Sequence, residues 1–154
     1  MLGKTAGGLY WMFRYLERSE NIARLIEAGF RIALTRPDNA QTEWGSVLDT
    51  ISVRQAYLEK RGEIDGAGVV DFLLRDKANP SSVKSCIQIA RDNGRLVRTG
   101  LTREVWEATN ECWMALTEAL SRPVRERDLP EVLALIRHQS AQVRGALHGT
   151  MLRN

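Results

Sequence analysis

The feature that most constrains the fold of this chain is a long, mostly apolar segment near the N-terminus. Thr5 is a typical helix cap, and the next strong turn signal is the Arg-Pro-Asp-Asn of residues 36–39, so the pattern predicts one helix over residues 6–34. Apolar side chains surround almost the whole of this helix, which is typical of a central helix. We therefore expect a long first helix that is largely buried.

Further helices follow from turn and cap signals. Asn79 before Pro80 is a typical helix start, and Asp128 with Glu131 has the spacing of a capping box. No segment alternates in hydrophobicity as a strand would. The expected helices cover residues 43–51, 54–60, 69–75, 80–98, 103–120 and 129–148. The sequence thus predicts an all-α helical bundle.

Composition places the chain among globular proteins with a single core. Its 154 residues are 44% hydrophobic and 27% charged, which excludes a disordered chain or a disulfide scaffold. Cys86 and Cys112 fall on apolar helix stripes, so we expect two buried thiols in a reducing compartment. The sequence lacks a signal-peptide run and a stretch of about 18 apolar residues. We expect one cytoplasmic domain over residues 1–154, neither secreted nor membrane-spanning.

The basic character of the chain is weak evidence for nucleic-acid binding. The formal net charge is +3, and the visible basic cluster, Arg91, Arg95 and Arg98 joined by Lys84, lies on one side of a predicted helix. Such a group is typical of an ordinary solvated helix face, whereas nucleic-acid-binding domains concentrate more charge on one surface. We do not expect a nucleic-acid partner.

Charged residues on the first helix are aimed at the same side as its apolar residues. At about 100° per residue, Glu20 and Glu27 project from the arc of Leu16, with Arg24 and Arg31 beside them. Each glutamate precedes its arginine by four residues, which is the favourable order for a helical ion pair. If this ridge is buried, its carboxylates must pair with guanidinium groups, because an isolated buried charge is too costly.

This ridge supplies the candidate site, and several interpretations of it stay open. The residues can form a structural ion-pair network, a pocket for an anion or ligand around Glu20 and Arg24, or a contact with a partner protein. As an enzyme site, Glu17 or Glu20 would act as acid or base while Arg18 or Arg24 holds an anionic substrate. The candidate residues are Glu17, Arg18, Glu20, Asn21 and Arg24.

Other chemistry has little support in the sequence. A dinuclear metal site in a helical bundle needs Glu-x-x-His spacing, which this chain lacks. His138 and His148 project from different faces of the last predicted helix, and neither Ser nor Cys lies in a nucleophile elbow. We expect no metal and no cofactor, and favour a role other than catalysis.

The order of short motifs along the chain resembles the bacterial Alpha-E family of all-helical proteins, whose name refers to a Glu-Arg pair. The resemblance begins in the first predicted helix and extends over essentially the whole chain. It rests on Leu9-Tyr10-Trp11, Arg14-Tyr15-Leu16-Glu17-Arg18, Glu20-Asn21, Ala23-Arg24, Asn79-Pro80-Ser81-Ser82, Ala90-Arg91-Asp92-Asn93, Trp106-Glu107, Asn110 and Gly149-Thr150-Met151-Leu152-Arg153. Phe13, Asp92 and Gly94 depart from the usual residues of the family.

The resemblance implies context rather than an activity. Similar proteins are about twice as long and carry a second Glu-Arg helix, so this chain resembles an N-terminal half with an exposed first-helix face, through which two copies would pair. They tend to be encoded with an ATP-grasp-like ligase. The resemblance therefore implies a non-catalytic helical interaction or scaffold subunit that works with such a ligase in peptide (amide-bond) synthesis or modification. The alternative is an enzyme, or a domain that binds a small anion or peptide, using the Glu-Arg cluster of the first helix.

Overall fold

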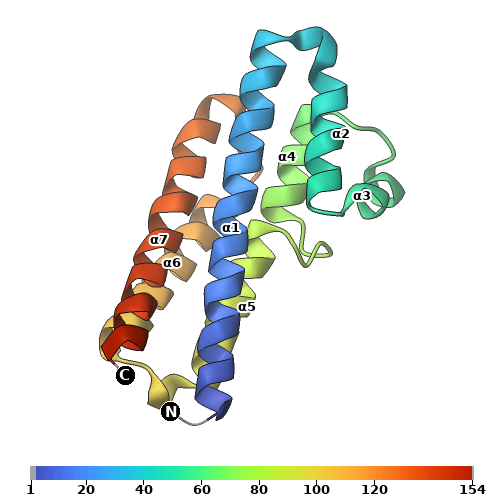
Figure 1. Cartoon of the computed structure of the whole chain (residues 1–154). Coiled ribbons are helices and arrows are strands. Elements are labelled where there is room, and N and C mark those ends of the chain that lie inside the picture. The colour runs from blue at the N-terminus through green and yellow to red at the C-terminus, as the bar shows by residue number, and fades with distance from the viewer. Residues whose placement is uncertain (1–2, 154) are drawn as a thin grey trace.

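A single long helix, α1 (Gly3–Thr35), forms the axis of the protein (Figure 1). This computed structural model describes the backbone of residues 3–153 and the side chains of residues 3–149. Short 3₁₀ turns at Pro37–Asn39, Arg98–Gly100 and Glu126–Asp128 connect some of the remaining helices. These are α2 (Ala40–Thr50), α3 (Arg54–Arg61), α4 (Gly66–Arg75), α5 (Val83–Leu96), α6 (Arg103–Ala119) and α7 (Leu129–Arg153). Residues 3–153 contain no strand, and the predicted all-α bundle is confirmed.

The central position of α1 follows from its apolar circumference. Figure 1 shows α7 and α5 running beside it and α2 beside its C-terminal part, and each of these helices packs on it. Leu9, Met12, Leu16 and Ile26 are buried in these contacts. The predicted long, largely buried first helix is confirmed, although α1 begins at Gly3, so Thr5 lies inside the helix rather than at its cap.

The start of α5 differs from the sequence prediction. Asn79 lies in a turn, where its Oδ1 accepts from the backbone N–H two residues on at 3.0 Å and its Nδ2 donates to the Phe72 carbonyl oxygen at 3.1 Å. The helix begins after Ser82, whose hydroxyl accepts from the Ser85 N–H at 3.1 Å. Serine is as good a cap as asparagine. The Asn-Pro pair is therefore used for a turn that joins α4 to α5.

Trp44 of α2 packs between the C-terminal half of α1 and the start of α4. Its indole ring lies closely against two glycines, Gly29 of α1 and Gly66 of α4. A Cβ atom at Gly29 would lie only 2.9 Å from the ring atom Cζ3, and a Cβ atom at Gly66 would lie 2.9 Å from Nε1. Only residues without a side chain admit the ring at both places. Trp44 is 3% exposed and belongs to the main core.

None of the helices within residues 3–153 combines the length and apolar character that crossing a bilayer requires.

Candidate functional site

Glu20 is the buried member of the candidate cluster. It is 3% exposed and lies on the side of α1 that faces α7, where Arg144 holds both of its carboxylate oxygens. Arg144 Nη2 donates to Oε1 at 2.8 Å, Nε contacts Oε2, and the guanidinium lies 5.8 Å from the Phe13 ring centroid. The hydrogen bond to Glu20 raises the pKa of Arg144. Arginine suits this two-pronged contact because its donors form a rigid fork.

A second ion pair repeats this arrangement one heptad further along α1. Glu27 Oε2 lies 2.8 Å from Nη1 of Arg137 on α7, and its Oε1 also accepts from Arg31 at 3.3 Å. The two glutamates are seven residues apart on α1, and so are Arg137 and Arg144 on the antiparallel α7. We call these two contacts the α1–α7 ion pairs. They fix the register of the two longest helices.

The expected pair between Glu20 and Arg24 is not formed, whereas that between Glu27 and Arg31 is. Arg24 is exposed and its Nη1 donates to Asn21 Oδ1 at 3.5 Å. A residue four positions along a helix is rotated by about 40° from the first. For Arg24 that rotation leads away from α7 and into solvent, so an arginine from another helix takes its place.

The Glu-Arg dipeptide lies on the outer side of α1. Glu17 is partly exposed and its Oε1 lies 3.8 Å from Nη1 of Arg14. The Arg18 guanidinium lies 5.5 Å from the Tyr15 ring centroid and is exposed. The five candidate residues therefore separate into one buried carboxylate, Glu20, and four residues at the surface.

The geometry around Glu20 favours structure over proton transfer. Both oxygens of the Glu20 carboxylate are already in contact with the Arg144 guanidinium, so neither is free to meet a substrate. Three cavities lie at the C-terminal end of α1, beside the start of α5 and beside the loop between α6 and α7. None of the five candidate residues lines any of these three cavities. Within the described part of the chain, no three His, Cys, Asp or Glu side chains gather as metal ligands.

Both cysteines are buried, as predicted. Burial raises the pKa of the Cys86 thiol to about 11 and that of the Cys112 thiol to about 12. The thiolate is the nucleophilic form of cysteine. At neutral pH both side chains are therefore protonated and pack as small apolar groups.

Two residues of the predicted basic cluster contact α6, Arg91 of α5 and Arg98 of the 3₁₀ turn after it, whereas Arg95 is exposed. The Arg91 guanidinium lies 4.2 Å from the Trp113 ring centroid, and its Nε donates to Asn110 at 3.1 Å. The Arg98 guanidinium lies 5.3 Å from the Trp106 ring centroid. These cation–π contacts join α5 and the turn after it to α6. The seven-residue spacing of Trp106 and Trp113, which places both on one side of α6, is a feature of the sequence that could have indicated them.

An aromatic surface covers the N-terminal half of α1 on its outer side. Tyr10 and Trp11 are 56% and 50% exposed, with ring centroids 5.3 Å apart, and the Tyr15 ring follows 6.1 Å from that of Trp11. Arg14 and Arg18 lie among these rings on the same helix. We call these five residues the α1 aromatic surface. The resemblance implied an exposed face on the first helix, but the sequence did not single out these five residues, because apolar side chains all round a central helix are expected to be covered.

Comparison with known proteins agrees with the resemblance drawn from the sequence. The model of the Alpha-E family, described as a predicted alpha-helical domain with a conserved ER motif, matches residues 1–154. Neither the curated proteins nor the solved structures include a match. Glu17 and Arg18 on α1 form a Glu-Arg dipeptide, and the structure is helical as the family description states. The chain belongs to the Alpha-E family.

Proposed function

We propose that this Alpha-E chain is a non-catalytic interaction or scaffold subunit that works with an ATP-grasp-like ligase in peptide synthesis or modification. The proposal rests on the contrast between a buried polar residue and exposed polar residues on α1. Glu20 is buried and neutralised by Arg144, so it builds the bundle, whereas the Glu-Arg dipeptide borders an exposed aromatic surface. The ligase and the peptide product come from the sequence resemblance.

The α1 aromatic surface has the composition of a binding surface. Tryptophan, tyrosine and arginine are the residues most enriched among those that dominate protein–protein binding energy. Here two aromatic side chains about half exposed and a third partly buried lie with two arginines on a single helix. Large exposed apolar groups gathered in one place mark interaction sites on soluble proteins.

Two copies of the chain pair through this surface in our proposal. In a two-fold pair each residue of one copy meets the equivalent surface of the other. With two α1 helices antiparallel, Arg14 and Arg18 of one copy reach the rings of Tyr10 and Trp11 of the second, so that cations meet aromatic faces. The paired helices then present one continuous surface to the ligase.

Calorimetric titration of the purified chain with an ATP-grasp-like ligase from the same organism tests the partnership. We expect saturable binding that Trp11→Ala weakens by about tenfold or more, as for a central interface tryptophan. Met114→Ala is the matched control, because Met114 is 63% exposed on α6 and lies outside the proposed surface. No heat of binding with the wild-type chain, or equal losses in both variants, would overturn the proposal.

A further inference from the structure

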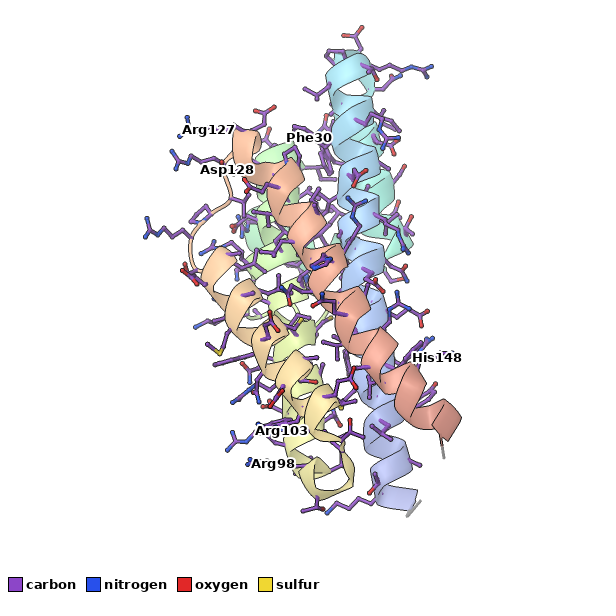
Figure 2. The ribbon with its side chains drawn as sticks, turned by 90° about the vertical axis from the view of Figure 1, so that its left-hand side faces the viewer. Phe30, Arg98, Arg103, Arg127, Asp128 and His148 are labelled. Atoms are coloured by element: carbon purple, nitrogen blue, oxygen red, sulfur yellow. The ribbon has the colours of Figure 1, made fainter. Side chains whose placement is uncertain are left out.

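A cavity of about 320 Å³ lies at the C-terminal end of α1, away from the α1 aromatic surface. It is bordered by α1, α2, α4, the start of α7 and the connection between α6 and α7, and it is partly open to solvent. Figure 2 labels Phe30 of α1 at the same end of the bundle as Arg127 and Asp128 of that connection. The apolar residues of its wall include Phe30, Ala33, Val70, Leu74 and Val124. Its volume is at the small end of the range for ligand sites, roughly 300–1,000 Å³.

One hydrogen-bond donor at the cavity wall has no acceptor among residues 3–149. Trp44 as a whole is 3% exposed, and no atom of residues 3–149 accepts a hydrogen bond from its indole N–H. Trp44 and Gly66 both line the cavity, and the indole Nε1 lies against Gly66. The indole Nε1 is not fully buried, so its N–H remains accessible from the cavity. The cavity therefore offers this N–H to an acceptor atom of a ligand.

The charges around the cavity disfavour an anionic ligand. Arg75 is fully engaged, since its Nε donates to the Leu120 carbonyl oxygen at 3.0 Å and its Nη1 to Asp71 at 2.7 Å. Asp71 is also held by Arg61 at 2.7 Å. Among the charged residues of the wall this leaves Glu126, which has no ion-pair partner in the described part of the chain. A carboxylate or phosphate would meet a negative charge and no free cation.

We propose that this cavity binds one apolar amino-acid residue of a peptide. The apolar side chain lies against Phe30 and Val70, and a carbonyl oxygen of the peptide accepts from the Trp44 indole N–H. A residue inside a peptide carries a carbonyl group and no charge, unlike a free amino acid or a fatty acid. The volume admits one such residue. This goes beyond the proposed scaffold role and does not rest on it, because the α1 aromatic surface lies elsewhere.

The indole N–H signals of ¹⁵N-labelled protein report on this site directly. The chain has four tryptophans, and Trp44→Phe identifies the Trp44 signal by removing it. Titration with N-acetyl-leucine amide should shift the Trp44 signal with saturation while Trp11, Trp106 and Trp113 stay in place. Affinity in Trp44→Phe, followed by the ligand's own signals, should fall by about two- to tenfold, the value of one hydrogen bond. N-acetyl-leucine, which carries a carboxylate, should bind several-fold more weakly than the amide.

A cavity-filling variant keeps the test decisive. Ala67 is exposed at the cavity wall on the first turn of α4, so Ala67→Phe should block the site without disturbing the core. Ala141→Phe, at an exposed position of α7, is the matched control and should bind as the wild type does. Absence of a saturable Trp44 shift, equal affinity for the anion, or unchanged binding by Ala67→Phe would each overturn the proposal. Circular dichroism melting checks that the variants are folded.

Discussion

One side of α1 meets two different environments along its length. Trp11 and Gly29 are 18 residues apart, which is five helical turns, so they project from the same side. At Gly29 the ring of Trp44 covers the helix closely, whereas Trp11 is half exposed. The difference teaches that burial on this helix is decided by where α2 packs. The uncovered half is the part that we propose for binding.

The largest expected difference is between Trp11, which projects from this side of α1, and Trp44 of α2, which covers the same side at Gly29. Trp44→Ala should lower the free energy of unfolding by about 3–5 kcal/mol, because it empties the space between Gly29 and Gly66. Trp11→Ala should change it by about 1 kcal/mol or less, since half of that side chain is already in water. Urea unfolding followed by circular dichroism measures both. Equal losses would show that the two halves of α1 are buried alike.

The next comparison is between the inner and outer arginines near Glu20. Arg144→Met should cost about 3 kcal/mol or more, because it leaves the Glu20 carboxylate buried without its partner. Arg24→Met, at an exposed position, should change stability by about 0.5 kcal/mol or less. The same urea titration compares them.

A double variant then separates a structural pair from a reactive group. Glu20→Met combined with Arg144→Met should recover most of the lost stability, since an apolar pair can replace a buried ion pair. A double variant as unstable as Arg144→Met alone would contradict the structural role of the pair.

The smallest expected effects come from two glycines of α1. Gly29→Ala should destabilise the protein by about 1–3 kcal/mol, because its Cβ would press on the rigid Trp44 ring. Gly7→Ala should instead stabilise it by about 0.5–1 kcal/mol, since no atom lies within 4 Å of the added Cβ and alanine favours the helix. Melting temperatures of the two variants should therefore move in opposite directions. A stabilising Gly29→Ala would show that α2 does not pack tightly there.

The features of the fold that depend on residues close together in the sequence could be predicted. Turn signals at residues 36–39 end the first helix within one residue of its observed end, and apolar periodicity places Cys86 and Cys112 inside. The start of α5 was predicted three residues too early, because Asn79 and Ser82 are both good caps. The Asn79 side chain instead donates a hydrogen bond to the distant Phe72 carbonyl oxygen, and Ser82 caps the helix. Local patterns leave such choices open.

The candidate site could be predicted only in part, because its partners come from distant positions. That a buried Glu20 needs an arginine follows from elementary electrostatics, but Arg144 lies 124 residues away along the chain. The heptad spacing of Arg137 and Arg144, matching that of Glu20 and Glu27, was the available signal. Nothing local marks Trp11 as exposed or Trp44 as the wall of a cavity, since both are tryptophans on helices.

The central claim is that α1 builds the bundle with one side and binds with the uncovered half of the other. Sedimentation velocity at micromolar concentration tests it most directly. We predict that the wild-type chain sediments as a dimer and that Trp11→Ala sediments as a folded monomer, with Met114→Ala unchanged from the wild type. A wild-type chain that remains monomeric throughout this range, or a Trp11→Ala variant that remains dimeric, would contradict the account.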